Sequence, residues 1–519
     1  MQKTRYLIVG AGPAGVQMAY HMQQAGDDYL VVEKGPRPGY FFETFPRHRT
    51  LISINKRFTG SDHPDFNMRH DWNSLLSDDL AHSFTDYDEN YFPNADSLTR
   101  YMADYCRKYE LSVQYNTEIT EVAAGDEGYL CRCADGREIR AEYLLIGTGL
   151  FKPLIPQIEG IEHAENYVDM SVDPSDFNNQ RVLIIGKGNS GFETADNLVA
   201  NASVIHVASP SSIRMAWKTH YVGHLRAVNN NLLDTYQLKS QNAVIDADIR
   251  CIEANGDNGY DVTFAYRHAQ GEVEVLSYDR ILCCAGFRID DGIFTDSARP
   301  QLTIKNKYPL LSSEFESVNC PKMYFIGTLT HSLDYRKTTS GFIHGFRYNV
   351  KALHSILGTK HEGRELPEED LYVSPLELSR HMLDRANVSG ALWQQPGYMA
   401  DYVYWSGSSI RYGTQLPIRY ITEQLAGAQS TVCTMSLEYG DPIEGDPFAV
   451  ERIHRENVEE ARSSKFLHPV IRIFQGGELV DEHHVLEDLE SRWEEPVHID
   501  PLAQFLERYF THPASVAVS

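Results

Sequence analysis

Two glycine-rich segments have the residue types and spacing to bind the pyrophosphate of a dinucleotide. In G-x-G-x-x-G, the first glycine forms a tight turn and the second lets backbone approach the pyrophosphate. The third lets the following helix pack closely on the preceding strand. The residues that we expect to contact cofactor in these segments are Gly10, Gly12, Pro13, Ala14, Gly15, Gly186, Gly188, Asn189, Ser190 and Gly191. The chain is therefore predicted to bind two dinucleotides.

The residues at the ends of the next strands distinguish the two sites. Glu33, followed by Lys34, can accept hydrogen bonds from ribose hydroxyls. At the second site Ser209 takes this place, and Arg214 and Lys218 follow. The missing acid and the nearby cations favour a cofactor that carries a 2′-phosphate. Both cations are also typical of a solvated loop. We therefore predict FAD at the first site and NADPH at the second, with NADH as the alternative, and hydride transfer to flavin.

The elements that must position these residues repeat along the chain. Apolar runs at 5–9 and 181–185 precede the glycine segments, and helical stretches reaching residues 25 and 199 follow them. Each unit closes with a strand and turn, at 143–150, which includes Thr148 and Gly149, and at 280–287. A strand at 323–326 leads into Gly327 and returns the chain to the first unit.

This pattern predicts an α/β fold with two Rossmann-type domains, the NADP domain inserted in the FAD domain, plus a C-terminal α+β region. The expected divisions are FAD domain 1–170, NADP domain 171–300, FAD domain again 301–360 and C-terminal accessory region 361–519.

Composition excludes several classes of function. The chain of 519 residues has 47 basic and 72 acidic residues, a net charge of −25, which disfavours nucleic-acid and membrane-surface binding. The N-terminal residues pass directly into a strand without the apolar segment of a signal peptide, so we expect a cytoplasmic protein. The eight cysteines form no C-x-x-C pair, and no residues have metal-ligand spacing, so we assign no metal site.

The motifs also carry a family resemblance. The two glycine segments, the Glu33-Lys34 pair, Thr148-Gly149 and YFPNADSLTRYMADYC resemble two-dinucleotide-binding-domain flavoproteins, in particular class B flavin monooxygenases. The longer stretches FPRHRTLISINKRFTG (45–60), THYVGHLRAVNNNLLDTYQLKS (219–240) and YRKTTSGFIHGFRYN (335–349) resemble the FAD-dependent oxidoreductase domain-containing family. The animal member of that family is the ER flavoprotein associated with degradation. The resemblance extends over nearly the whole chain.

The resemblance implies roles for further residues. Asn55, followed by Lys56, matches an asparagine that lies against the flavin and protects oxygenated flavin, so both are predicted catalytic residues; a turn amide is the alternative for Asn55. Gly341 and His344 match the place where a helix N-terminus faces the isoalloxazine. We also include Val122 and Gly327 among the cofactor contacts.

The leading hypothesis is an NADPH-dependent FAD monooxygenase that activates O2 as a C4a-(hydro)peroxide and oxygenates, through N-oxygenation, a small amine or amino-acid-like substrate. Residues 220–231 are polar and could hold that substrate, although a loop that contacts NADPH or a solvated loop would explain the same residues. One alternative is an NAD(P)H-dependent flavin oxidase or reductase. The other is a flavoprotein scaffold that binds a protein through residues 361–519. By analogy we expect a homodimer.

Overall fold

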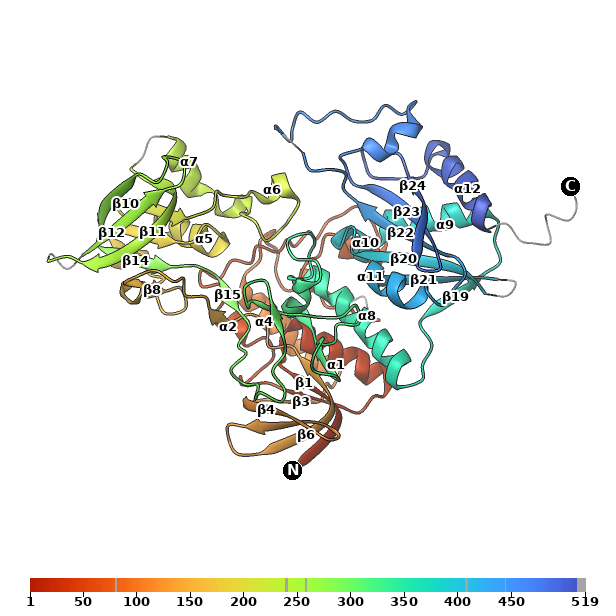
Figure 1. The fold of residues 1–519 in the computed structure, drawn as a ribbon, viewed down its shortest axis with the longest axis horizontal. Helices are drawn as coiled ribbons and strands as arrows, with labels where there is room; N and C mark the ends of the chain where they lie inside the picture. The colour runs from red at the N-terminus through yellow and green to blue at the C-terminus, as the bar shows by residue number, and fades with distance from the viewer. Residues whose placement is uncertain (80–81, 239–240, 257–258, 407–408, 444, 511–519) are drawn as a thin grey trace, which may run out of the picture.

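The chain forms three lobes, each built around a β-sheet (Figure 1). The computed structural model describes residues 1–79, 82–238, 241–256, 259–406, 409–443 and 445–510. In this part of the chain no helix has the length and hydropathy of a membrane span.

The first lobe contains a sheet with strand order β3-β2-β1-β6-β5-β4, and β18 pairs with the second half of β6. Its parallel strands are β1 (Gln2–Val9), β2 (Tyr29–Val32), β3 (Val113–Gln114), β6 (Glu138–Ile146) and β18 (Met323–Phe325). An antiparallel pair, β4 (Ile119–Gly125) and β5 (Gly128–Cys133), extends it. Helices α1 (Pro13–Ala25), α4 (Ala95–Lys108) and α8 (Ile343–His361) share one core cluster with β1. Both faces of the parallel strand β1 are covered by other elements, which explains why its sequence contains a continuous apolar run.

Small elements complete this lobe. They are α2 (Phe41–Thr44), α3 (Pro64–Met68), the hairpin of β16 (Leu302–Thr303) with β17 (Tyr308–Pro309), and the 3₁₀ segment η5 (Gly327–Ser332).

The second lobe has the strand order β13-β12-β11-β10-β9-β14-β8. These strands are β8 (Glu165–Asn166), β9 (Arg181–Ile185), β10 (Val204–Ser209), β11 (Ala243–Ala254), β12 (Tyr260–Tyr266), β13 (Val273–Tyr278) and β14 (Arg280–Cys283). Its helices are α5 (Asn189–Leu198), α6 (Ala216–Thr219) and α7 (Asn231–Gln237). The parallel β9–β10 and β9–β14 pairs repeat the arrangement around β1.

The chain crosses between these two lobes earlier than the sequence indicated. The two crossings pair with each other as β7 (Lys152–Pro153) and β15 (Phe287–Arg288). Strand β8 already belongs to the second sheet, and a bridge between Phe294 and Val122 joins residue 294 to the first lobe. The expected divisions at 170/171 and 300/301 therefore both fall too late, since apolar patterning does not reveal a two-residue crossing.

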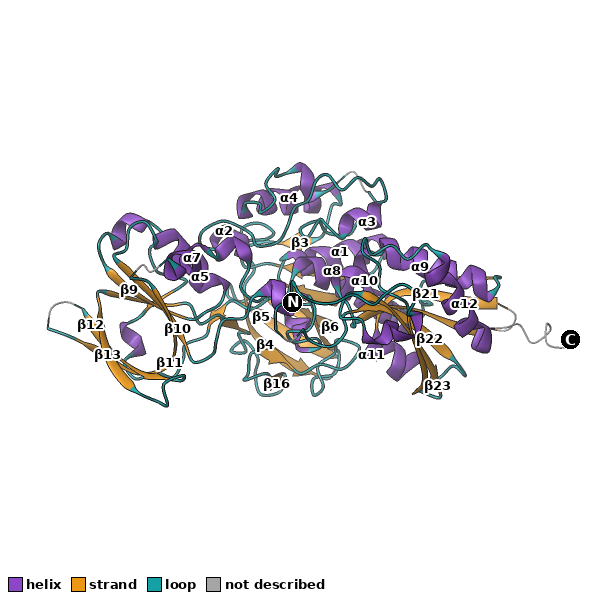
Figure 2. Cartoon of the chain, turned by 90° about the horizontal axis from the view of Figure 1, so that it is seen from above, coloured by secondary structure: helices purple, strands orange, loops and turns teal. Residues whose placement is uncertain are grey.

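The C-terminal lobe is an antiparallel sheet with its two longest helices packed against one face (Figure 2). Its strand order is β19-β21-β20-β22-β23-β24, and its strands are β19 (Glu368–Leu371), β20 (Met399–Ser406), β21 (Ser409–Pro417), β22 (Val432–Glu438), β23 (His468–Gln475) and β24 (Glu478–His484). Helices α9 (Pro375–Val388) and α12 (Pro496–Phe510) share its core cluster, and α10 (Gly390–Gln394) and the short α11 (Ile418–Tyr420) complete it.

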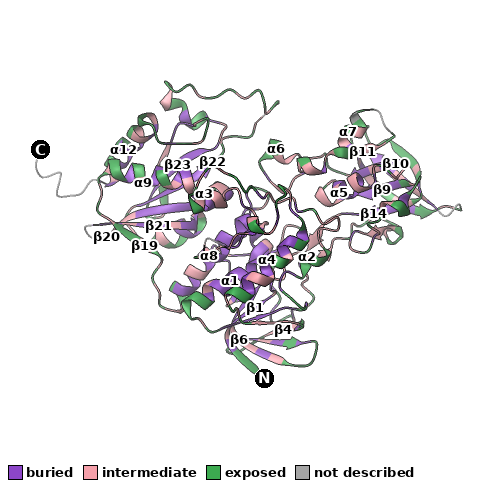
Figure 3. Ribbon diagram, turned by 180° about the vertical axis from the view of Figure 1, so that it is seen from behind, coloured by how far each residue is buried: buried purple, intermediate pink, exposed green. Residues whose placement is uncertain are grey.

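The C-terminal lobe packs against helix α8 and the segment that precedes it. The amide of Gln395, just after α10, donates to Ser340 Oγ and Asn349 Oδ1, each at 2.9 Å. The Arg69 guanidinium lies 3.3 Å from the ring centroid of Trp393 and donates to the carbonyl of Asn387 at 2.7 Å. Figure 3 shows α8 as a largely buried helix. The C-terminal lobe is thus part of the support of α8 rather than a separate appendage.

Arg347 of α8 joins this helix to the segment that precedes residue 75. Its side chain is 0% exposed. Its guanidinium donates to the carbonyls of Met68 (2.6 Å), Asp71 (2.9 Å) and Ser74 (2.8 Å). These bonds hold the segment that carries Trp72 against the first turn of α8.

Candidate functional site

The first glycine motif is fixed by backbone contacts. Gly10 ends β1 with φ +106°, and a Cβ on it would lie 2.7 Å from the Gly147 carbonyl oxygen. A Cβ on Gly15 would lie 1.9 Å from the oxygen of Gly10, so helix α1 packs where only glycine fits. Gly12, the N-cap of α1, has no described atom within 4 Å of its Cβ position, and Pro13 follows at N1. The N-terminal amides of α1 are therefore accessible to an anion.

The second motif repeats this geometry residue by residue. Gly186 ends β9 with φ +121°, and its Cβ would lie 2.4 Å from the oxygen of Cys284. A Cβ on Gly191 would lie 2.1 Å from the oxygen of Gly186, whereas the Cβ position of Gly188, the N-cap of α5, meets open space among the described atoms. Two helix N-termini are thus prepared for pyrophosphate binding.

Glu33 is held at the ribose position beside the first motif. Its carboxylate accepts hydrogen bonds from the backbone N–H groups of Ala11 and Gly35, each at 2.8 Å. Together with Lys34 it lines a cleft that continues from Gly12 and Thr148. The predicted acid is therefore oriented toward a bound nucleotide by the glycine turn itself.

Two larger cavities meet between the first and second lobes. The first cavity, of about 370 Å³, is lined by residues that include Gly12, Pro13, Ala14, Thr148, Gly149, Gly327, Gly341 and His344. The second cavity is lined by residues that include Gly186, Gly188, Ser209 and Arg214. Both cavities have Ile52, Asn189, Ser190, Thr328, Gly341 and Phe342 in their linings. Two bound dinucleotides would thus approach each other at this shared lining.

The N-terminus of α8 faces the first cavity. Gly341, the N-cap Phe342 and the first helical residues Ile343 and His344 all line it. No side chain caps the first-turn N–H groups of this helix in the described structure. A helix N-terminus in this position stabilises negative charge on a ligand, as reduced flavin carries.

His344 is a neutral, unpartnered imidazole at this end of the first cavity. It is 1% exposed, stacks on Trp72 at 4.1 Å between ring centroids, and neither ring nitrogen has a hydrogen-bond partner among the described residues. Burial, aided by the nearby Arg347 and Arg226, holds its pKa well below the usual value.

Glu193 places a titratable carboxyl in the first cavity. It lies one helical turn after Asn189 on α5 and accepts a hydrogen bond from the Tyr167 hydroxyl. Burial raises the pKa of Glu193 to about 7, although this hydrogen bond opposes the shift. The i, i+4 spacing from Asn189 could have revealed this residue from the sequence.

A hydrogen-bonded chain crosses between the lobes at the second cavity. The Tyr221 hydroxyl lies 2.9 Å from Nε2 of His331, whose Nδ1 lies 2.9 Å from the Asp334 carboxylate. The Tyr221 and His331 rings also stack, with centroids 5.5 Å apart. Tyr221 and His331 line the second cavity, and no spacing in the sequence signals their pairing.

The predicted site residues Val122, Asn55 and Lys56 line neither these cavities nor the cleft beside Glu33. Val122 is fully buried in the core, and its N–H and C=O pair with Ile293 and Thr295, so the predicted cofactor contact is not supported. The Asn55 amide donates to the Asp88 carbonyl at 2.6 Å, as the alternative of a turn amide expects, and neither Asn55 nor Lys56 lines the first or second cavity. The neighbouring Thr50, Leu51, Ile52 and Ser53 line the first cavity instead.

The fold and the paired cavities define an oxidoreductase with two dinucleotide-binding domains. The profile of the pyridine nucleotide-disulphide oxidoreductase family matches residues 7–327, more than half of the chain, and the chain belongs to that family. FAD-dependent oxidoreductase domain-containing protein 2 of Mus musculus is 37% identical in an alignment that covers 97% of this chain and 83% of the mouse protein. The chain is therefore an FAD-dependent oxidoreductase.

Solved structures share the architecture of the first two lobes. A flavin-containing monooxygenase from Stenotrophomonas maltophilia has a TM-score of 0.53 at 17% identity, over 69% of this chain and 99% of that one. Bacillithiol disulfide reductase Bdr from Staphylococcus aureus has a TM-score of 0.52 at 18% identity, over 70% and 100%. At these identities the likeness is one of fold, which a monooxygenase and a reductase share.

The two glycine motifs can be separated by matched substitutions. We expect Gly15→Ala to lose bound flavin, because its methyl would meet the Gly10 carbonyl. Gly191→Ala should keep flavin. The concentration of nicotinamide dinucleotide that gives half-maximal flavin reduction should rise by about tenfold or more in this variant. Flavin absorbance per protein and anaerobic reduction measure these effects, with Gly427→Ala, in open space, as control. Flavin loss in G191A with retention in G15A would reverse the assignment.

Glu193 predicts a pH dependence of stability. Since its pKa is about 7 in the folded protein against 4.5 ordinarily, the folded chain retains a proton that the unfolded chain releases. Wild-type stability therefore falls between these values as pH rises, and Glu193→Gln lacks that loss. Relative to wild type, we expect the variant to gain about 1–3 kcal/mol between about pH 4.5 and pH 7. Thermal unfolding tests this, with the exposed Glu478→Gln as control; a pH-independent difference would contradict it.

Proposed function

We propose that this FAD-dependent oxidoreductase is an NADPH-dependent monooxygenase that oxygenates a small amine or amino-acid-like substrate. The observation that carries the proposal is the lining shared by the first and second cavities, at the N-termini of α5 and α8. It provides a position where a nicotinamide in the second cavity and a flavin in the first would be in contact. Bound FAD would accept the hydride and would then react with O2.

The residues of the second cavity support NADPH over NADH. Ser209 stands where an acid would select NADH, and the exposed Arg214 lines the same cavity without an ion-pair partner among the described residues. The nearby acid Asp246 is bound by Lys187 and by Ser212, so its charge is compensated. A free guanidinium beside a neutral strand end suits a 2′-phosphate.

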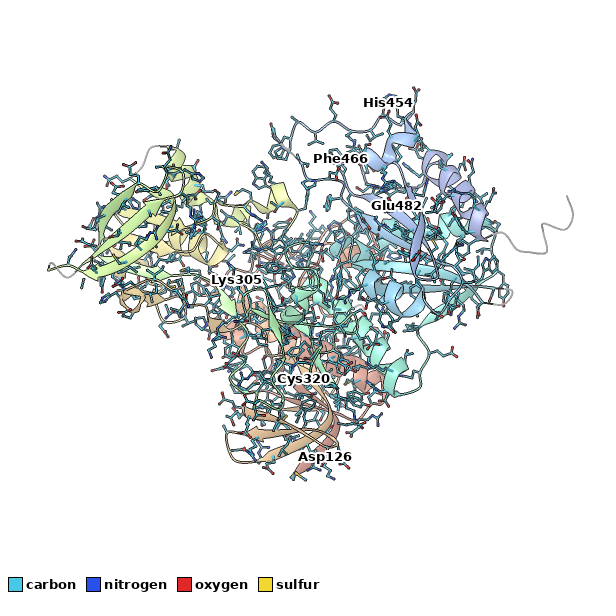
Figure 4. The ribbon with its side chains drawn as sticks, in the orientation of Figure 1. Asp126, Lys305, Cys320, His454, Phe466 and Glu482 are labelled. Atoms are coloured by element: carbon cyan, nitrogen blue, oxygen red, sulfur yellow. The ribbon has the colours of Figure 1, made fainter. Side chains whose placement is uncertain are left out.

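The cysteines favour oxygen over a disulfide as electron acceptor. All eight are free, and Cys284 alone lines the described junction, within the second cavity. Burial raises the pKa of the Cys284 thiol and of its neighbour Cys283, which disfavours the reactive thiolate. Cys320, labelled in Figure 4, lies in the core of the first lobe. A dithiol relay to a thiol substrate is therefore not supported by this arrangement.

The function is tested by NADPH consumption under air, with peroxide quantified and amines and amino acids added singly. We expect one class of compound to lower the ratio of peroxide to NADPH while an oxygenated product forms. Peroxide equal to NADPH with every compound would favour an oxidase. Reduced flavin that persists under air would overturn oxygen activation and favour a reductase.

Cofactor selectivity provides a separate prediction for Arg214. We expect Arg214→Gln to raise the KM for NADPH by about tenfold or more, ~1.4 kcal/mol, because a charged contact to the 2′-phosphate is lost. The KM for NADH should remain unchanged. Lys218→Gln is the control, because Lys218 is an exposed cation in the nearby helix α6 that does not line the second cavity. Equal effects on NADPH and NADH would remove the proposed role.

A further inference from the structure

One end of the first cavity is formed by Trp72, Arg226 and His344 and brings a positive charge into a mostly apolar lining. The Arg226 guanidinium lies 5.3 Å from the ring centroid of Trp72, and Trp72 stacks on His344. All three residues line the cavity. We call these three residues the polar corner.

The polar corner contains a positive charge without a counter-charge. Arg226 forms no ion pair with the described residues, and its guanidinium donates from Nη1 to the Ile52 carbonyl at 2.8 Å. The acid of the same cavity, Glu193, is instead bonded by Tyr167. Burial lowers the pKa of Arg226 from its ordinary value, which reflects the cost of a desolvated cation. An anionic ligand would offset this cost.

His344 adds a second unsatisfied group beside this cation. Both of its ring nitrogens are buried and lack hydrogen-bond partners in the described part of the chain, and the side chain is 1% exposed. A neutral imidazole offers one donor and one acceptor. A buried polar group of this kind requires a hydrogen-bond partner. A ligand bound in the cavity that His344 lines can be this partner.

Asn189 positions the polar corner beside the shared lining. Its Oδ1 accepts from the backbone N–H of Arg226 at 3.0 Å, and its Nδ2 donates to the His224 carbonyl at 2.9 Å. Asn189 is also the first residue of α5 and lines both cavities. The loop that carries Arg226 is thus anchored at the point where flavin and nicotinamide would meet.

The anions of the two cofactors have other places in this structure. Their pyrophosphates fit the open N-termini of α1 and α5 at Gly12 and Gly188, and a 2′-phosphate fits Arg214. Negative charge on reduced flavin faces the N-terminus of α8. The Arg226 guanidinium of the polar corner therefore remains for an anion that neither dinucleotide supplies.

We propose that Arg226 and His344 form a carboxylate subsite, so that the substrate is a small carboxylic acid of the amino-acid type. Arg226 binds the carboxylate with two parallel hydrogen bonds, and His344 donates a third. The nucleophilic heteroatom of the substrate then extends toward the shared lining. This inference rests on the proposed function only for what happens to that heteroatom, because binding itself requires neither NADPH nor O2.

The test measures ligand binding to the oxidised, FAD-loaded protein. Binding is detected as a change in the visible absorbance spectrum of the flavin. The probes are amino acids and simple monocarboxylates, each paired with its uncharged amide. We expect carboxylates to perturb the spectrum and the amides not to. Arg226→Gln should raise the Kd of the carboxylate by about tenfold or more, and Arg226→Lys should raise it less, because lysine keeps the charge without the paired donors. Lys218→Gln should leave the Kd unchanged.

Three outcomes would overturn the subsite. They are equal binding of acid and amide, no perturbation by any carboxylate into the tens of millimolar, and loss of flavin from R226Q, which would assign Arg226 to the cofactor. Flavin content per protein, measured for every variant, detects the last case and any failure to fold. Carboxylate binding that depends on Arg226, without any oxygenated product in the turnover assay, would sustain the subsite while contradicting the proposed monooxygenase.

Discussion

One wall of the first cavity is joined to its neighbour by the buried guanidinium of Arg347, which forms no ion pair with the described residues. Arg347 instead donates to three main-chain carbonyls, those of Met68, Asp71 and Ser74, whose dipoles partly offset the cost of burying its positive charge. These hydrogen bonds join α8 to the segment that carries Trp72. Trp72 stacks on His344 in the first turn of the same helix, so both contacts connect this segment to the helix that lines the first cavity.

The C-terminal lobe reinforces the same helix from its other side. Gln395 bonds the segment before α8 and a residue within it, while Arg69 spans from the first lobe to Trp393 and Asn387. These contacts join the C-terminal lobe to the helix whose N-terminus lines the first cavity.

The sequence reveals those features whose cause is local. A strand, a glycine turn and a helix N-terminus lie within about twenty residues, so Gly10, Gly15, Gly186 and Gly191 were placed with their physical roles. Both dinucleotide-binding units and the α/β class followed from the repeat of that pattern. The strand at 181–185 and the helix that follows it match β9 and α5 closely.

Features set by distant contacts could not be read in the same way. The resemblance predicts Asn55 as a catalytic residue, but its hydrogen bond to the Asp88 carbonyl decides where the side chain lies. Likewise, pairing with Ile293 and Thr295 places Val122 in the core. Trp72 had no signal, because its place depends on the bonds that Arg347 makes. The same holds for Tyr221 and His331, which are 110 residues apart in sequence.

The Tyr221–His331 contact has a consequence for how the molecule moves. It joins a loop of the second lobe to the first lobe through a buried hydrogen bond and a ring stack, with Asp334 fixing the imidazole. Swinging one lobe away from the other would break the Tyr221–His331 hydrogen bond and separate the two stacked rings, whereas the His331–Asp334 contact lies within the first lobe and would remain. Breaking a buried hydrogen bond costs free energy until water replaces the lost partner. This contact therefore opposes separation of the two lobes beside the second cavity.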